Sequence, residues 1–281
     1  MPTYDVHQHL LPPTLVEALR ARREPPRIIG GSLELGEGTF PFEERDHDLG
    51  ERIALLDRDG IDVAIVSLAP TMETEGKSEL EQAYNEGIRA VVAEAGGRFR
   101  AFAAGECLDG FAGVCVSASA VVGGLGALPD ALARAGQALF VHPGPPGAPP
   151  AGAPFWWTAV VDYPAQMQTA YFAWLEDGVQ HHPDIDVVFA VLAGGAPVQL
   201  ERLRSRGGDP ERASHPRIHL DVASYGPRAL DLCLAAVGQA QLVYGSDRPV
   251  VDAAPTLDAL AGLGQDVLDT VRRDNPGRLF G

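Results

Sequence analysis

The chain has 281 residues, of which 46% are hydrophobic and 21% are charged, and its formal net charge is −16. This length suits one large domain, such as an α/β barrel of roughly 250 residues. The excess of 38 acidic over 22 basic residues repels phosphate backbones and anionic lipids. The composition therefore argues against nucleic acid and membranes as partners and leaves a small-molecule substrate.

Three cysteines, Cys107, Cys115 and Cys233, are too few and too scattered for a disulfide framework or a paired-cysteine metal site. The first ten residues have neither a basic start nor an apolar stretch, so no signal peptide is visible. Both observations predict a reducing, cytoplasmic location.

Short β-branched runs alternate with helix-like segments along the chain, a pattern typical of parallel strands joined by crossover helices. Capping boxes that begin at Thr14 and Ser78 predict two helix starts, and Gly60 and Gly136 predict two helix ends. Eight alternations suggest a (β/α)8 barrel, although an open doubly wound sheet has the same pattern. The predicted strands are residues 4–10, 63–68, 99–104, 114–120, 138–142, 186–192, 218–223 and 242–245.

We expect a single domain over residues 1–281, with two long connections at 23–46 and 143–164. The second connection is rich in proline and glycine, contains Trp156 and Trp157, and follows a strand. In a barrel it would lie on the catalytic face, so we interpret it as a lid loop that packs over the site. The alternative is a loop that faces another subunit.

The strongest motif is Asp5-Val6-His7-Gln8-His9 in the first strand. Side chains alternate along a strand, so Asp5, His7 and His9 are expected to face the barrel interior together. Burying these polar groups is costly unless a divalent cation binds them. Histidines that only form hydrogen bonds in a polar core are the alternative.

Two further residues end later strands. His142 ends the predicted fifth strand, and Asp247 follows the eighth. Only a closed sheet brings both to the mouth that contains His7 and His9. Three histidines and one carboxylate suit a single divalent metal ion, with Zn²⁺ expected and Fe²⁺ or Mn²⁺ as alternatives.

With these residues the chain resembles the amidohydrolase superfamily, and within it the amidohydrolase-related (amidohydrolase 2) group that includes aminocarboxymuconate-semialdehyde decarboxylase. The resemblance implies a (β/α)8 TIM barrel, a mononuclear metal held by His7, His9, His142 and Asp247, and hydrolysis or decarboxylation of a small organic acid. It also implies a homodimer. The matching motifs are DVHQH (5–9), LFVHPG (139–144), AGGAP (193–197), LERL (200–203), DVASYG (221–226), YGSDRP (244–249) and NPGRLFG (275–281).

The only lysine is Lys77. Binuclear members of the superfamily bridge two metals with a carboxylated lysine from the fourth strand, and no lysine lies near residues 114–120. We therefore expect one metal rather than a lysine-bridged pair. Cys115 is interpreted as a small buried apolar residue rather than as a bridging thiolate.

One position departs from the family pattern. Related sequences place a histidine at the end of strand six, where this chain has Val191. An isopropyl group cannot accept a proton, polarise a carbonyl or bind a metal. His219 is a candidate to replace that histidine, whereas His47 is expected to be solvated.

The sequence favours a metal-dependent hydrolase that acts on a small cyclic or carboxylate-bearing substrate through a metal-activated water. A metal-dependent nonoxidative decarboxylase (carboxy-lyase) is the alternative. A second alternative is a divergent barrel without hydrolytic activity, such as a binding protein, isomerase or cyclase, because of Val191. Asp247 is the expected general acid and base. The expected substrate-binding residues are Arg248, Trp156, Trp157 and Ser224.

Overall fold

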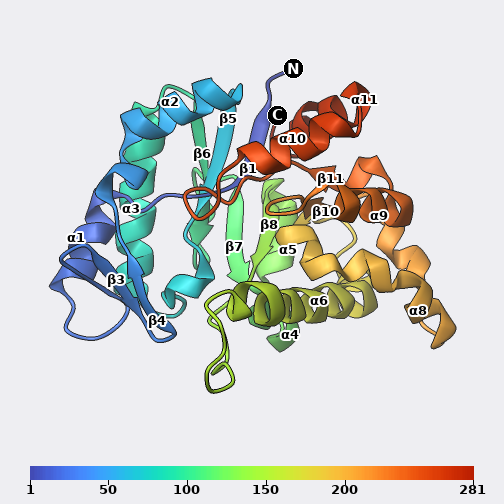
Figure 1. Ribbon diagram of the computed structural model, residues 1–281, viewed down its shortest axis with the longest axis horizontal. Coiled ribbons are helices and arrows are strands. Elements are labelled where there is room, and N and C mark those ends of the chain that lie inside the picture. The colour runs from blue at the N-terminus through green and yellow to red at the C-terminus, as the bar shows by residue number, and fades with distance from the viewer.

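The computed structural model describes residues 1–281 and contains an eight-stranded sheet in which all neighbouring strands are parallel. The strands lie side by side in chain order, in the middle of the molecule, with helices around them (Figure 1). They are β1 (Tyr4–His9), β5 (Val63–Ser67), β6 (Phe99–Ala104), β7 (Gly113–Ser117), β8 (Ala138–His142), β9 (Val187–Phe189), β10 (Ile218–Asp221) and β11 (Leu242–Val243).

Hydrogen bonds between β1 and the segment that contains β11 close this sheet into a barrel. The Val6 N–H donates to the Tyr244 carbonyl at 2.8 Å, and the Asp247 N–H donates to the His7 carbonyl at 2.8 Å. An open doubly wound sheet would leave both of these edges unpaired. The predicted (β/α)8 barrel is therefore confirmed.

Several strands end earlier than predicted. β7 stops at Ser117 because the Ser117 hydroxyl accepts a hydrogen bond from the Ala120 N–H (3.2 Å) and caps the next helix, α4 (Ala118–Gly123). β9 stops at Phe189, so Val191 lies in the turn that follows the strand rather than inside it.

The two predicted helix ends are correct, since Gly60 and Gly136 both adopt left-handed backbone (φ 64° and 65°) after a helix. The two capping boxes are wrong. The Thr14 hydroxyl donates to the Ala83 carbonyl at 2.7 Å, and Ser78 is already the first helical residue, without a side-chain cap.

The helices are α1 (Pro13–Ala21), α2 (Leu49–Asp59), α3 (Ser78–Glu94), α4 (Ala118–Gly123), α5 (Leu128–Ala135), α6 (Tyr163–Ala173), α7 (Val179–His181), α8 (Leu200–Ser205), α9 (Pro227–Val237), α10 (Ala254–Gly262), α11 (Gln265–Asp269) and α12 (Asn275–Phe280).

Two connections depart from a regular barrel. Within residues 23–46, strands β2 (Arg27–Ile29), β3 (Ser32–Leu35) and β4 (Gly38–Pro41) form a separate antiparallel sheet. Residues 105–112 join β6 to β7 without a helix. A cavity of about 490 Å³ lies beside β7, between α3 and the segment before α5, and none of the four expected metal ligands lines it.

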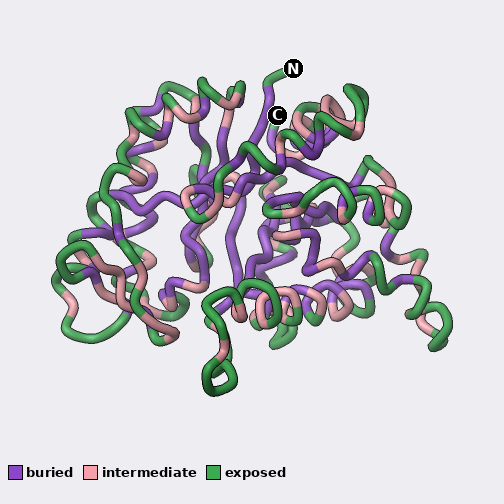
Figure 2. The backbone as a smooth tube through the Cα atoms, viewed as in Figure 1, coloured by how far each residue is buried: buried purple, intermediate pink, exposed green.

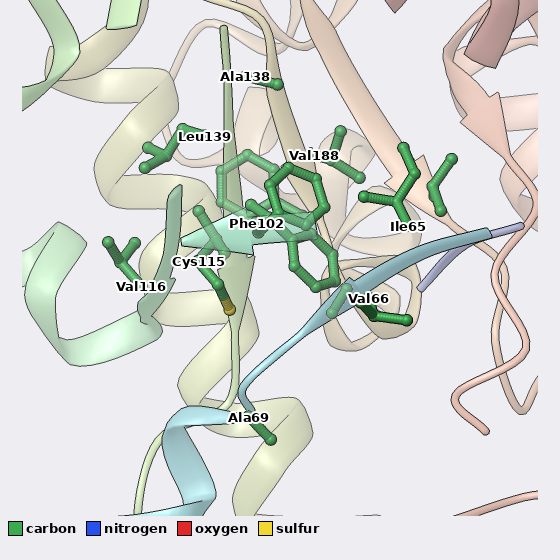
Figure 3. Close-up of a cluster of buried hydrophobic side chains, with 14 of the residues drawn as sticks. Ile65, Val66, Ala69, Phe102, Cys115, Val116, Ala138, Leu139 and Val188 are labelled. Carbon is green, nitrogen blue, oxygen red and sulfur yellow. The ribbon is translucent and has the colours of Figure 1, made fainter. Parts of the chain in front are cut away.

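The core lies inside the barrel and between the strands and the outer helices, as the buried segments in Figure 2 show. Phe102 stacks on Phe140 with ring centroids 5.0 Å apart. Figure 3 shows Phe102 and Cys115 grouped with other apolar side chains of neighbouring strands. All three cysteines are unpaired. No helix has both the length and the apolar character needed to cross a bilayer.

Gly113 is required by the close approach of β7 and β8. A Cβ atom at this position would lie 1.8 Å from the Ala138 carbonyl oxygen, which is backbone and cannot move aside. We expect Gly113→Ala to lower the free energy of unfolding by about 3 kcal/mol in urea titrations. Gly262→Ala is the control, because a Cβ there meets no atom within 4 Å. Equal stability of the two variants would contradict this assignment.

Candidate metal centre

Four side chains that are distant in the sequence meet at the carboxyl ends of the barrel strands. One ligand atom from each of His7, His9, His142 and Asp247 lies within 4.8 Å of the others. The Nε2 atoms of His7 and His9 are 3.1 Å apart, and Asp247 Oδ1 lies 3.4 Å and 3.2 Å from them. The structure thus brings together the complete ligand set predicted from the sequence.

Asp5 does not join this cluster, contrary to the expectation from strand alternation. The register with β5 shifts between Asp5 and Gln8, which breaks the two-residue period of β1. Asp5 therefore accepts hydrogen bonds from the Gln8 side chain (2.7 Å) and the Ser246 N–H (3.0 Å). Its role is to tie β1 to the segment before Asp247.

The ring nitrogens that face away from the cluster each contact an oxygen acceptor, which orients the rings. A backbone carbonyl can only accept, so Nδ1 of His9 and of His142 must donate, and their Nε2 atoms offer lone pairs to the centre. The contacts are His7 Nδ1 to Asp221 Oδ2 (2.6 Å), His9 Nδ1 to the Ser67 carbonyl (3.2 Å) and His142 Nδ1 to the Pro143 carbonyl (2.9 Å).

The three histidines have different pKa values because of their burial and the charges of the groups around them. Burial lowers the pKa of His9, and it lowers that of His142 further because both other histidines lie nearby. Burial also acts against protonated His7, but the carboxylates of Asp221 and Asp247 outweigh it and raise its pKa to about 9. The same histidines keep the pKa of Asp247 below its usual value despite burial, so Asp247 is ionised.

Asp247 is presented by a left-handed backbone conformation (φ 61°), which aspartate tolerates better than most residues. Its N–H donates to the His7 carbonyl, and its own carbonyl accepts from the Val250 N–H at 2.9 Å. These bonds hold the carboxylate over the histidines rather than along the strand.

Asp221, at the end of β10, is a residue of the site that sequence reasoning missed. Its fully buried carboxylate contacts His7 Nδ1 and accepts hydrogen bonds from the Val191 N–H (3.1 Å) and the Ala223 N–H (2.7 Å). Metal-binding histidines are commonly oriented by such a carboxylate. Its position at a strand end within DVASYG was the available signal.

Val191 begins a run of five left-handed residues, with φ between 47° and 78°, that continues to Gly195. This conformation is unfavourable for a β-branched residue. It directs the Val191 N–H at Asp221, so the backbone of this position supports the site although its side chain has no polar group. His219 does not replace the absent histidine, because its Nε2 lies 3.5 Å from Asp186, before β9 and at the opposite end of the barrel.

Arg248 does not join the cluster. Its guanidinium donates to Asp59 (2.8 Å) and to Asp252 (3.0 Å), so it is already paired with carboxylates. This corrects the expectation that it is free to bind a substrate carboxylate.

The lid loop does not fold over the cluster. Trp156 is 53% exposed and stacks on Trp157, with ring centroids 6.2 Å apart. Residues 158–162 form a helical turn that leads into α6, so the irregular part ends earlier than predicted. Ser224 is exposed with φ 68°. Substrate contacts of these three side chains stay predictions.

Cys115 and His47 can now be assigned structural roles. Cys115 is buried, burial raises the pKa of its thiol, and it lies outside the four-ligand cluster, as expected of a core residue. His47 is not solvated, contrary to expectation. Its Nδ1 accepts from the Leu11 N–H at 3.2 Å, and its ring stacks on Phe42.

Together, the closed barrel and the buried His3Asp cluster define a (β/α)8 protein with a site that can hold one metal ion. The chain belongs to the amidohydrolase family, whose pattern matches residues 4–281. No curated protein matches the chain.

Several solved structures share the fold. They include IDCase from Metarhizium anisopliae in apo form, with a TM-score of 0.83 and 19% identity over 99% of this chain and 97% of that one. The 5-carboxyvanillate decarboxylase LigW from Sphingomonas paucimobilis has a TM-score of 0.74 and 17% identity over 99% and 98%. A dihydroxybenzoic acid decarboxylase from a Polaromonas species, with bound manganese and 2-nitroresorcinol, has a TM-score of 0.70 and 14% identity over 99% and 96%.

Removing the Asp221 carboxylate tests its role as the group that orients His7. We expect Asp221→Asn to weaken binding of Mn²⁺ or Zn²⁺ by about 10- to 100-fold in competition with a chelator, because the His7 ring loses its anionic acceptor. Asp186→Asn is the control, since Asp186 contacts His219 and Arg217 but no ligand. Unchanged affinity in the Asp221 variant would contradict the assignment.

His47 makes stability depend on pH. Burial, followed by the charge of Arg52, lowers the pKa of His47 in the folded chain to about 4, compared with 6.5 for the free side chain. As the pH falls from 6.5 to 4, His47 takes up a proton in the unfolded chain but not in the folded chain. The free energy of unfolding therefore falls with the pH over this range. The expected loss is about 3 kcal/mol.

We expect His47→Asn, which keeps an acceptor for the Leu11 N–H, to flatten the dependence of the free energy of unfolding on pH between 6.5 and 4. His181→Asn, at an exposed position, is the control and should leave the slope unchanged. Identical slopes for both variants would show that His47 is not responsible.

Proposed function

We propose that this protein is a metal-dependent nonoxidative decarboxylase that acts on a small carboxylic acid. The observation that carries the proposal is the buried His7/His9/His142/Asp247 cluster, which could hold one metal ion and has no lysine beside it to bridge a second. Similar structures that are named as decarboxylases support it. The proposal reverses the order of preference that the sequence suggested, in which hydrolysis came first.

The donor set fits a divalent cation. Lone pairs on the Nε2 atoms of His7 and His9 would repel one another at 3.1 Å unless a proton or a cation lies between them, and Asp247 adds one negative charge on the same side. Three imidazoles and a carboxylate are ligands that Zn²⁺ and Mn²⁺ accept. When bound, such an ion supplies a positive charge that attracts a substrate carboxylate and stabilises the electron-rich carbon left by loss of CO₂.

Decarboxylation needs only one proton donor among the side chains around the metal. The bond between carbon and the carboxylate breaks, its electron pair stays on the carbon, and one proton forms the new C–H bond. Asp247 is ionised in the free site, so its carboxylate must first take up a proton from water, and it then delivers this proton to the carbon. The isopropyl side chain of Val191 supplies neither a base nor an acid for either reaction, so the preference for decarboxylation is supported by the similar structures that are named as decarboxylases. Because Arg248 is paired elsewhere, a metal ion held by His7, His9, His142 and Asp247 would supply the positive charge for the substrate carboxylate.

The metal identity and the cellular setting belong to the same proposal. Manganese is bound in the Polaromonas decarboxylase, and Zn²⁺ suits the same donors, so both ions should be tested. Three unpaired cysteines support a reducing, cytoplasmic setting.

The test is incubation of the Mn²⁺- and Zn²⁺-loaded protein with a panel of aromatic carboxylic acids, including dihydroxybenzoates and 5-carboxyvanillate. We expect CO₂ release, one deuterium in the organic product when the reaction runs in D₂O, and no ¹⁸O in that product when it runs in H₂¹⁸O. No CO₂ release from any acid of the panel by the metal-loaded protein would overturn the proposal.

Substitution of Asp247 separates its two roles. We expect Asp247→Asn to lower the rate of CO₂ release by at least about 100-fold, because the amide can still contact the metal but cannot deliver the proton. Metal content should be measured on the same sample. Full activity in a metal-loaded Asp247→Asn variant would remove Asp247 from proton transfer.

A further inference from the structure

A contact between Tyr163 and Glu37 joins two segments that lie outside the eight strands of the barrel. Tyr163 is the first residue of α6, directly after the helical turn that ends the lid loop, and Glu37 lies in the turn between β3 and β4. The Tyr163 hydroxyl donates to the two oxygens of the Glu37 carboxylate at 3.4 Å and 3.5 Å. In Figure 1 the β3–β4 hairpin and α6 both lie in the lower part of the view.

Tyr163 lies beside the candidate metal centre. The next residue, Pro164, packs so closely on Gly194 that a Cβ atom at Gly194 would lie 2.3 Å from the Pro164 carbonyl oxygen. Gly194 belongs to the left-handed run that begins at Val191 and supports the site. Burial raises the pKa of Tyr163, and the charges of nearby carboxylates, Asp247 among them, raise it further. The phenol is therefore neutral and within the field of the metal-binding cluster.

Glu37 reaches the mouth of the barrel from the side of β5. The N–H of Gly36 donates to Glu73 Oε1 at 2.6 Å, which ties the β3–β4 turn to the segment that follows β5. The last carbonyl of β5 is the acceptor that orients His9. The contact between Glu37 and Tyr163 therefore crosses from the segment after β5 to the segment after β8, on the side of the barrel where the metal-binding histidines lie.

This contact leaves hydrogen-bonding capacity free on both groups. Hydrogen bonds between two oxygens are most often about 2.7–2.8 Å long, so contacts of 3.4 Å and 3.5 Å are weak. Tyr163 is the only donor to the Glu37 carboxylate, which has lone pairs for several more hydrogen bonds. A ligand that enters the mouth can therefore bond Glu37 without breaking a strong interaction.

No positive charge balances Glu37. Burial raises the pKa of this half-buried carboxyl group, the Tyr163 hydroxyl opposes the shift, and the charges that act on Glu37 are the carboxylates of Glu73 and Asp162. Arg248 is paired elsewhere. A ligand that brings a hydrogen-bond donor reduces the cost of burying such a carboxylate, whereas a ligand that brings another carboxylate is repelled.

We propose that Glu37 and Tyr163 determine which substrates the metal centre accepts. The inference rests on the proposed decarboxylase function and names its substrate class. The substrate carries one carboxylate, which reaches the metal, and an amino or hydroxyl group at its other end, which donates to Glu37. An acid with a second carboxylate at that end is rejected by the three carboxylates around the mouth. Both residues bind and position the substrate and take no part in proton transfer.

The experiment is isothermal titration calorimetry of the Mn²⁺-loaded full chain at pH 7. The ligands are benzoates that carry an amino group, a hydroxyl group or a second carboxylate in the meta or para position. We expect the amino- and hydroxybenzoates to bind about 10-fold more tightly than unsubstituted benzoate, the effect of one hydrogen bond to a charged group. The dicarboxylates should bind at least about 10-fold more weakly than benzoate.

Glu37→Gln should remove both differences, because the amide keeps the shape of the side chain but has no negative charge. Glu37→Asp keeps the charge and should still reject the dicarboxylates. Glu34→Gln is the matched control, since Glu34 is a half-buried residue of the same hairpin that pairs with Arg27 at 2.6 Å. It should bind every ligand as the wild-type chain does. Circular dichroism of each variant reports whether its fold is intact.

Metal content and CO₂ release, measured on the same samples, separate this inference from the proposed function. A chain that takes up no metal would overturn both. A metal-loaded chain that binds the ligands in the expected order without releasing CO₂ from any acid would overturn the decarboxylase assignment and support the ligand preference. A metal-loaded wild-type chain that binds none of the benzoates or binds all of them equally, or a Glu37→Gln variant that keeps the wild-type order, would overturn the inference.

Discussion

The hydrogen bonds that join β1 to the segment around β11 are the constraint on which the site depends. They bring Asp247 over two histidines that lie about 240 residues earlier in the chain. The pairing also fixes the position of β1 along the barrel axis. As a result, His7 and His9 lie close to His142 at the end of β8. Without closure, the four ligands would lie at separate edges of a sheet, and no common centre would exist.

Closure alone does not orient the ligands. The shift in register within β1 rotates Asp5 away from the centre while His7 and His9 remain there, and Asp5 then bonds the segment that leads to Asp247. Asp221 orients His7 in turn, and the strained backbone that begins at Val191 supplies one of its hydrogen-bond donors. Unfavourable backbone conformations at Val191 and Asp247 both lie at this site, where surrounding contacts can sustain them.

The same acidic composition has different consequences at different places. Around most of the surface it repels other acidic molecules, whereas at the candidate metal centre the carboxylates of Asp221 and Asp247 contact imidazoles. The face formed by α4, the lid loop and α6 contains a single acidic side chain, Asp162.

The sequence by itself predicted the eight strands of the barrel and the four side chains that meet at its mouth, because strand alternation and residues at strand ends are local features. Its single lysine also argues against a lysine-bridged metal pair. It did not predict the small sheet of β2, β3 and β4. It could not reveal Asp221, the turned-away Asp5 or the paired Arg248, since each depends on a partner that is distant in the chain or on a shift in register. Likewise, tryptophans in a long loop suggested a lid, and only the tertiary structure showed that their neighbours face solvent. Local patterns record which groups reach the barrel mouth, whereas side-chain direction there is decided by packing and hydrogen bonding between distant segments.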